Sequence, residues 1–293
     1  MISYSQNCED VLLNRLFPAD HRGFYIDVGA SHPTTGSVTA HFYNHGWHGI
    51  NVEPSCSFEH LANARPRDVN LQLALTDQPG ADQPGSATFH EFPEAPGLSS
   101  FRSELADVAI AKFGFRCMRR PVAVATLEQV CREYAGGPID FMTIDVEGHE
   151  REVLAGADFR LFRPRVVVVE ATKPHGGESL HACWEPLLLS ADYLFAFFDG
   201  LNRYYVRRED PELVSKLAVP ANVFDNFVTY SEHCNIERIH ALTYRITTTE
   251  QLGRYSLAAA RRLNRLEAAL HRIPAALWQL WHGRPIGKPV RFT

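Results

Sequence analysis

The sequence predicts an α/β fold built around a mostly parallel, seven-stranded sheet, and three observations lead to this class. Short apolar segments, several of them ended by Asp or Glu, alternate with segments of helical length, which is typical of right-handed βαβ units. The chain has 293 residues, of which 45% are hydrophobic and 22% charged, enough for one full α/β core and an addition. No apolar run approaches the roughly 20 residues that span a bilayer.

The N-terminal part of the chain has the clearest alternation. Strands are expected over 23–28, 49–52 and 70–75, and helices over 36–46 and 56–65 between them. In an open parallel sheet, ligands bind beyond the carboxyl ends of the strands. The residues that follow these strands are therefore candidates for a binding site.

Residues 78–120 interrupt this alternation. Turns are predicted at Pro79-Gly80, Pro84-Gly85 and Pro96-Gly97. A short strand over 87–91 and a helix over 103–113 are expected between and after these turns. We predict that this segment is an insertion above the binding site, acting as a lid or a substrate loop.

The alternation resumes after the insertion and closes with an antiparallel pair of strands. The last two strands are predicted to form a hairpin turned at Asp199-Gly200. Helices are expected over 126–135 and 182–190, and strands over 139–144, 165–169, 193–198 and 203–206.

The C-terminal tail differs from the rest of the chain in charge. The net charge is -5, but residues 245–293 carry nine Arg or Lys against two acids. The acidic body argues against nucleic acid as a partner. Apolar residues recur at helical spacing over 251–273, which predicts a basic amphipathic helix. We therefore expect a main domain over 1–245 and a helical tail over 246–293.

Cysteine usage and the N-terminus predict a cytoplasmic location. The six cysteines are widely scattered, and no C-x-x-C occurs, which is typical of reduced thiols rather than a disulfide framework. The segment from Met1 to Gln6 has neither a basic start nor an apolar stretch, so we expect no export signal.

The turn after the first strand indicates which cofactor the sheet would hold. Asp27 is followed by a turn with one glycine, Gly29, where a dinucleotide site has three because its backbone approaches a pyrophosphate. S-adenosylmethionine has no phosphate, and its amino-acid part can lie against Gly29 and Ala30. Glu53 suits two ribose hydroxyls, and Asp77 the adenine amino group. Each acid alone can instead be a helix cap or a loop residue.

Five motifs follow one another in the chain: Ser5–Asp10, Gly23–Pro33, Ser37–Thr39, Gly46–Pro54 and Ile144–Glu150. Together they resemble motifs of the FkbM family of methyltransferases, over about residues 3–172. The resemblance implies a Rossmann-like class I methyltransferase fold, S-adenosylmethionine as methyl donor and a hydroxyl acceptor. It implies cofactor contacts around Gln6, Gly29, Ser37 and Glu53, to which we add Asp27 and Pro54 beside them. Cys8 is a departure, since relatives often carry glycine there.

A second set of motifs resembles a subset of this family linked to polysaccharide and lipopolysaccharide biosynthesis. It implies that the acceptor is a sugar hydroxyl of a glycan. A lipid or polyketide hydroxyl and a non-catalytic scaffold for glycan-assembly enzymes are the alternatives, while the missing glycines disfavour a nicotinamide-dependent oxidoreductase. The motifs are Glu170–Thr172, Trp184-Glu185, Asp199–Tyr205 and Pro220–Asp225.

Two groups after the later strands are candidates for the chemistry. A sugar hydroxyl must lose its proton to act as a nucleophile, and we predict His149 as the general base, with Asp145 as the next candidate. His149 can instead satisfy a loop carbonyl. Asp145 and Glu170 end adjacent strands and could together hold Mg²⁺, as metals serve some related sugar methyltransferases.

Other polar and aromatic residues suggest two further sites. Trp184, Asn202, Arg203 and Tyr204 are predicted to form a carbohydrate platform. In the alternative interpretation, Trp184 belongs to the core and Arg203 pairs with an acid. His41, His45 and His48 suggest zinc, but the sequence around them is not that of a zinc motif, so packing or exposed roles are expected.

The tail has three possible contact surfaces. Its helix can pack on the protein's own core, on another subunit of a homo-oligomer, or on the inner face of the membrane, where it would bring the protein close to glycan-assembly enzymes. Beyond Pro274, two tryptophans and two leucines lie among Arg272, Arg284 and Lys288. Large apolar groups among cations are typical of interfacial membrane helices.

Overall fold

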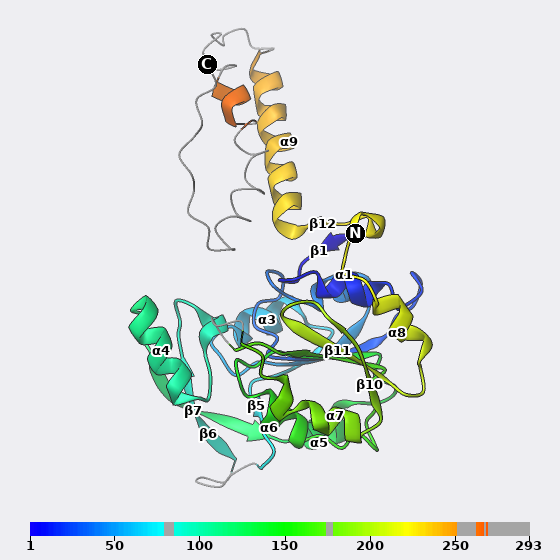
Figure 1. Cartoon of the computed structure of the whole chain (residues 1–293). Helices are drawn as coiled ribbons and strands as arrows, with labels where there is room; N and C mark the ends of the chain where they lie inside the picture. The colour runs from blue at the N-terminus through cyan, green and yellow to red at the C-terminus, as the bar shows by residue number, and fades with distance from the viewer. Residues whose placement is uncertain (79–84, 174–177, 251–261, 267, 269–293) are drawn as a thin grey trace, which may run out of the picture. The chain divides into compact units, whose positions relative to one another are not determined.

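A computed structural model describes residues 1–78, 85–173, 178–250, 262–266 and 268 (Figure 1). Contacts between Cα atoms divide the chain into two units, Met1–Glu232 and His233–Thr293. The first unit contains all the strands of the described residues. Helix α9 (Tyr230–Glu250) begins in the first unit and ends in the second. The predicted boundary at residue 245 therefore falls inside a helix.

The predicted α/β class is confirmed by a seven-stranded sheet with the order β10-β11-β9-β8-β2-β3-β4. All neighbouring strands pair in parallel except at β11, which is antiparallel to both of its neighbours. The strands are β2 (Phe24–Val28), β3 (His48–Val52), β4 (Val69–Leu71), β8 (Phe141–Ile144), β9 (Val166–Glu170), β10 (Tyr193–Phe198) and β11 (Asn202–Arg207).

The strand order reverses between β2 and β8, which lie side by side at the centre of the sheet. From β2 the chain adds β3 and β4 on one side, and from β8 it adds β9 and the hairpin on the other. Val28, at the end of β2, stands between Val52 of β3 and Ile144 of β8. A ligand site is therefore expected beyond the carboxyl ends of these strands.

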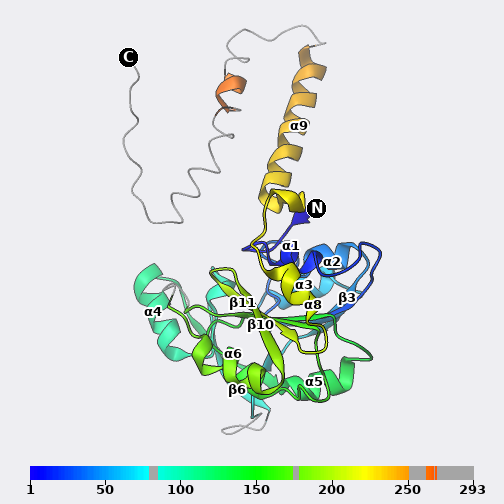
Figure 2. The same cartoon turned by 45° about the vertical axis from the view of Figure 1, so that its right-hand side comes forward.

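Helices cover both faces of the sheet, as Figures 1 and 2 show. Strand residues alternate between two apolar clusters, so that Tyr25 packs with α1 and α8 while Ile26 packs with α5, α6 and α7. The helices are α1 (Glu9–Asn14), α2 (Ala40–Asn44), α3 (Phe58–Ala64), α5 (Leu127–Tyr134), α6 (Glu150–Ala155), α7 (Glu185–Ser190) and α8 (Glu212–Leu217), with short 3-10 turns η2 (His181–Cys183) and η3 (Val223–Asp225).

The insertion contributes two strands, β6 and β7, to a small sheet with the order β5-β7-β6. A helix lies between these two strands in the sequence. The insertion contains β6 (Ser86–Glu91), η1 (Pro96–Leu98), α4 (Ser103–Phe113) and β7 (Met118–Ala125). The predicted helix over 103–113 and the strand over 87–91 are confirmed. The single strand predicted over 70–75 is wrong, because β4 ends at Leu71 and β5 (Ala74–Leu75) pairs in parallel with β7.

The two ends of the first unit meet in a short parallel pair. β1 (Ile2–Ser3) pairs with β12 (Val228–Thr229), and the Met1 ammonium donates to the Asn226 carbonyl at 2.6 Å. Neither strand is visible in the sequence pattern, since two residues carry no periodicity.

Most of the predicted amphipathic helix over 251–273 lies outside the described residues. Within it, residues 262–266 and 268 are helical. Over the described parts of the chain, no helix combines the length and the apolar character needed to cross a membrane.

Candidate active site

A pocket of about 260 Å³ lies at the carboxyl ends of the central strands. Its lining comes from the ends of β2, β3 and β8, from the N-terminal segment and from the insertion, which contributes Phe89, Ser99 and Phe101. The insertion thus forms part of the pocket wall. The predicted site residues in the lining are Gln6, Asp27, Gly29, Ala30, Ser37, Glu53, Pro54, Asp145, His149 and Asn202.

The turn at Gly29 ties three strand ends together. The backbone N–H groups of Gly29 and Ala30 donate to the Val52 carbonyl at 2.9 and 3.2 Å. Gly29 has a φ of +85°, and a Cβ atom there would lie 1.8 Å from the carbonyl oxygen of Asp145. Both observations require glycine, because a side chain would be strained and would collide with backbone.

Glu53 is held by two backbone N–H groups. Ser31 N–H donates to Oε2 at 2.7 Å, and Ser55 N–H donates to Oε1 at 2.6 Å. Burial raises the pKa of Glu53, and these hydrogen bonds oppose the increase. The Ser55 hydroxyl also contacts this carboxylate, and the group so oriented lines the pocket, where it can accept from hydroxyl donors of a ligand.

Asp27 is anchored below the pocket by two threonines. Thr39 Oγ1 donates to Oδ2 at 2.6 Å, and Thr143 Oγ1 donates to Oδ1 at 2.8 Å. Burial raises the pKa of Asp27. Because both oxygens are turned to these hydroxyls, Asp27 links β2, β8 and the segment before α2.

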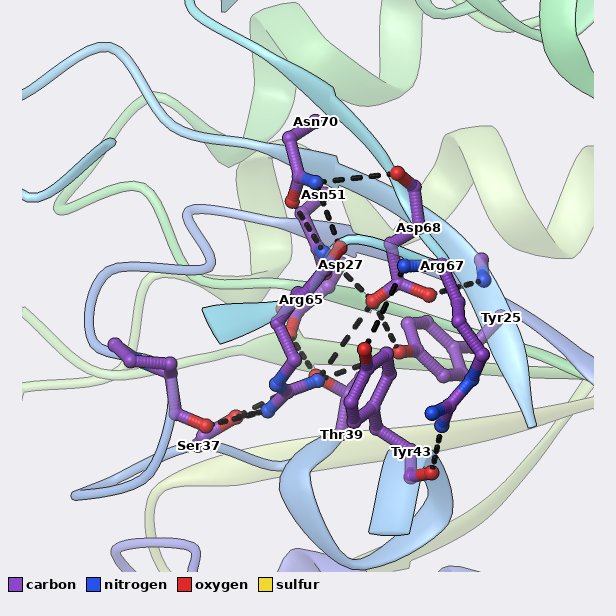
Figure 3. Close-up of polar contacts among 12 residues, drawn as sticks. Tyr25, Asp27, Ser37, Thr39, Tyr43, Asn51, Arg65, Arg67, Asp68 and Asn70 are labelled. Carbon is purple, nitrogen blue, oxygen red and sulfur yellow. Dashed lines mark hydrogen bonds and ion pairs between the residues drawn. The ribbon is translucent and has the colours of Figure 1, made fainter. Parts of the chain in front are cut away.

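Arg65 contacts the segment before α2, as Figure 3 shows. This buried guanidinium donates to the Pro33 carbonyl at 2.5 Å and to Ser37 Oγ at 3.1 Å. It also forms an ion pair with Asp68 at 3.8 Å. Asp68 in turn accepts from the Tyr25 hydroxyl at 2.6 Å and from Gly49 N–H at 2.9 Å. A paired buried network of this kind holds the pocket wall rigid.

The loop between β8 and α6 carries the candidate catalytic groups. Glu147 and Gly148 both have positive φ, +53° and +90°. Glu150 Oε1 accepts from the N–H groups of Gly148 at 2.9 Å and Val146 at 3.3 Å, and Ser100 Oγ of the insertion donates to the Glu147 carbonyl at 2.8 Å. These contacts fix the tight turn that places Asp145, Glu147 and His149 in the pocket wall.

The surroundings of His149 favour the neutral form of its imidazole. Burial lowers its pKa, an effect that the nearby carboxylates of Glu152 and Asp77 partly oppose. Its Nδ1 lies 3.6 Å from Glu152 Oε2, and its ring lies 5.2 Å from that of Phe101. A neutral ring nitrogen can accept a proton, as a general base must.

Four acidic side chains gather around the end of β8. Burial raises the pKa of Asp145, Glu147 and Glu170, and that of Glu150 to about 7. For Glu170, the charges of the three neighbours raise the pKa further. Asp145 is exposed and lines the pocket, whereas Glu170 is buried and absent from the lining.

The sequence matches the profile of a known protein family. The profile of the FkbM methyltransferase domain matches residues 27–195, more than half of the chain. The chain belongs to the FkbM methyltransferase family. The fold is accordingly that of a Rossmann-like class I methyltransferase.

One solved structure and the curated proteins complete the comparison. The crystal structure of methyltransferase FkbM from Methylobacillus flagellatus KT is 13% identical, with a TM-score of 0.38, and the match covers 63% of this chain and 43% of that one. The chain thus spans less than half the length of that protein. No curated protein matches the sequence.

Glu9 and Asn202 line the pocket together with Gln6. Asn202 Nδ2 donates to Glu9 Oε1 at 2.7 Å, and Asn7 N–H donates to Glu9 Oε2 at 2.7 Å. Burial raises the pKa of Glu9 to about 7. Glu9 is missing from the residues predicted from sequence, because an acid at the start of a helix is usually a dipole partner. Cys8 before it has a φ of +64°, a left-handed conformation that glycine adopts without strain.

The predicted carbohydrate platform is wrong for three of its four residues. Trp184 and Tyr204 are fully buried in the two apolar clusters, so neither can contact a sugar. Arg203 Nη2 forms an ion pair with Glu185 at 2.9 Å, and its guanidinium lies 4.0 Å from the Phe195 ring centroid. The alternative interpretation is confirmed, and Asn202 alone of the four reaches the pocket.

The remaining candidates lie outside the pocket lining. Asp77 follows β5 in the small sheet, so it does not end a strand of the large sheet as the adenine assignment assumed. The rings of His41 and His45 lie 4.2 Å apart. In the part of the chain that the structure describes, no three side chains of His, Cys, Asp or Glu are grouped to hold a metal, either at these histidines or at Asp145 and Glu170.

Proposed function

We propose that this protein is an S-adenosylmethionine-dependent O-methyltransferase that methylates a sugar hydroxyl of a surface polysaccharide or a related glycan. The charge of the pocket carries this proposal. Five carboxyl side chains and one imidazole line it, and no Lys or Arg occurs among its lining residues as described. The five are Glu9, Asp27, Glu53, Asp145 and Glu147.

An acidic lining selects between cofactor classes. Phosphate-bearing cofactors need cations or a glycine-rich turn, and this pocket would repel them. S-adenosylmethionine, when bound, supplies a methyl group on a positively charged sulfonium, which buried carboxylates favour. Glu53 is oriented for the ribose hydroxyls, while the wall at Gly29 and Ala30 lies open to the amino-acid part. These residues fit the cofactor that the family implies.

The acceptor must lose a proton, and His149 is the group placed to take it. Its lowered pKa keeps the imidazole neutral near pH 7, which is the form that a general base requires. Asp145, beside it in the pocket wall, is the second candidate. Asn202 offers an amide at the same pocket, which suits the hydroxyl groups of a sugar.

Two alternative functions suggested by the sequence fit this pocket less well. A lipid or polyketide hydroxyl would need apolar walls, whereas this pocket is rich in carboxyl groups. A non-catalytic scaffold would have no need for an oriented Glu53 and a neutral His149. Mg²⁺ at Asp145 and Glu170 also stays a prediction, which chelation tests directly: activity lost in excess chelator and restored by Mg²⁺ would support it.

Two measurements test the proposed function. Titration calorimetry with S-adenosylmethionine tests the cofactor without any acceptor. Mass spectrometry of cell-surface glycans, compared between cells with and without the gene, tests the acceptor and should show methyl groups that depend on the gene. Absence of cofactor binding would reject the enzyme, and binding with unchanged glycans would reject the sugar acceptor.

A further inference from the structure

Glu9 is a buried carboxylate that faces the cofactor pocket without a cationic partner. Its side chain accepts hydrogen bonds from Asn202 Nδ2 and Asn7 N–H, and contacts with the Ser5 hydroxyl and its own backbone N–H also lower its pKa. No ion pair joins it to Lys, Arg or His within the described residues, and the charge of another acid, Asp199, raises its pKa further. The residue is 4% exposed.

Such a group is costly unless a ligand compensates it. Burial of a carboxyl group without a countercharge disfavours its ionised form, and a bound cation would compensate for this. Neutral hydroxyls would not supply the missing charge. The site therefore fits a ligand that brings a cation with N–H donors.

The N-terminal segment holds Glu9 rigidly against the cofactor loop. Ser5 bridges to Gly36 in parallel, which docks the segment on the loop before α2. Asp10 accepts from Ser3 Oγ at 2.6 Å and from Tyr4 N–H at 2.6 Å. This ordering precedes ligand binding, so the carboxylate needs little rearrangement to make its contact.

The position of Glu9 suits the far end of an extended ligand. Glu53 follows β3, while Asn202, the partner of Glu9, begins β11. The two strands are separated by β2, β8 and β9. Four strand spacings amount to roughly 19 Å between backbones, a span that the inward side chains shorten. A ribose on Glu53 therefore needs an arm along the strand ends to reach Glu9.

We propose that Glu9 binds the α-ammonium group of the amino-acid arm of S-adenosylmethionine. The proposal rests on the cofactor assigned above and adds the residue that recognises its amino-acid end. Gln6 and Ser37, uncharged donors in the same lining, suit the α-carboxylate. Ser37 Oγ accepts from Arg65 at 3.1 Å and lies 3.4 Å from Thr39 Oγ1, a long contact that a ligand oxygen could replace as the acceptor of the Ser37 hydroxyl hydrogen.

The test compares three ligands on Glu9→Gln by titration calorimetry. S-adenosylmethionine and S-adenosylhomocysteine carry the amino-acid arm, and 5′-methylthioadenosine lacks it. Loss of one charged hydrogen bond, about 1.5–3 kcal/mol, should weaken the first two by roughly 10- to 150-fold. The affinity for 5′-methylthioadenosine should stay at the wild-type value.

Controls separate this role from packing. Glu9→Asp keeps the charge and should lose less affinity than Glu9→Gln, and Glu185→Gln, which removes a carboxylate outside the pocket, should retain all three affinities. Binding of 5′-methylthioadenosine shows that each variant is folded. Equal losses for all three ligands, or no loss for any, would overturn the proposal. Failure of the wild-type protein to bind any of them would instead reject the cofactor assignment.

Discussion

Two carboxylates of this pocket are oriented by different kinds of hydrogen-bond donor. Glu53 is fixed by two backbone N–H groups, and Asp27 by two threonine hydroxyls, so both are oriented before a ligand arrives. Their roles differ because the oxygens of Asp27 are turned to side-chain donors below the pocket. Glu53 is therefore the better candidate for direct contact with ribose.

Glu53→Ala should weaken S-adenosylmethionine binding by about 1.5–3 kcal/mol, the value of hydrogen bonds to a charged acceptor. Glu53→Gln keeps the shape and one carbonyl acceptor and should lose less. Calorimetry measures both, with thermal unfolding as the check that the turn at Ser31 and Ser55 survives. Wild-type affinity in a folded Glu53→Ala variant would remove the ribose assignment.

His149→Ala should lower turnover by roughly 10²- to 10⁴-fold and leave cofactor affinity nearly intact, because a general base acts only on the acceptor. Since burial lowers the pKa of His149, activity should persist below pH 6.5 and fall as pH drops through the lowered value. His48→Ala, an exposed histidine outside the pocket, serves as the control. Near-normal turnover of His149→Ala would transfer the role to another group, with Asp145 next.

At the scale of elements, strands with apolar runs could be predicted and those built from polar residues could not. The strands ended by Val28, Val52 and Ile144 are buried on both faces, which leaves a clear apolar signal. β7 contains Arg119, Arg120 and Pro121, a composition that reads as loop. Pro121 is tolerated because it pairs with Thr88 and lies outside the stretch bound by β5.

The site was predicted where residues follow strands and missed where the chain folds back. The strand-end rule found Gly29, Glu53 and Asp145. It could not find Arg65 or Glu9, because a charged residue beside a short helix normally faces water, and only the tertiary fold buries these two. Trp184 failed for the opposite reason, since an aromatic residue near the site has the same sequence signal in the core as on a sugar platform.

The turn after β2 provides a test at this scale. Gly29→Ala should destabilise the protein by about 1–3 kcal/mol or more and abolish cofactor binding, because the backbone is left-handed and the new Cβ would meet the Asp145 carbonyl. Gly36→Ala is the matched control, with a φ of +74° but nothing within 4 Å of its Cβ. Equal thermal unfolding of the two variants would show that the close contact is not decisive.

Among the described residues, buried acids outnumber buried bases around the pocket. Their pKa values are raised, to about 7 for Glu9 and Glu150 and to about 11 for Glu170, and these shifts make stability depend on pH. A carboxyl group whose folded pKa exceeds its unfolded one stabilises the protein at low pH and loses that contribution as pH rises through the folded value. Buried histidines with lowered pKa act in the opposite sense, but only below about pH 6.5.

Without ligand, the midpoint of thermal unfolding should therefore fall as pH rises from about 6.5 to 8.5, by several degrees for each kcal/mol lost. Saturating S-adenosylmethionine should flatten this decline, because its positive charge favours the ionised carboxylates. Scanning calorimetry over this range, with and without ligand, measures both effects. A midpoint that rises with pH in the unliganded protein would contradict the assigned pKa shifts.

The parallel pair of β1 and β12 has a practical consequence for the boundaries of any expressed fragment. Residues 226–229 hold the first three residues of the chain, and the segment that follows carries Gln6 and Glu9. A fragment that stops before Val228 retains every strand of the large sheet. It lacks β12, so the N-terminal segment loses the strand pairing that holds it. Shortened versions of this protein should thus lose cofactor affinity before they lose their fold.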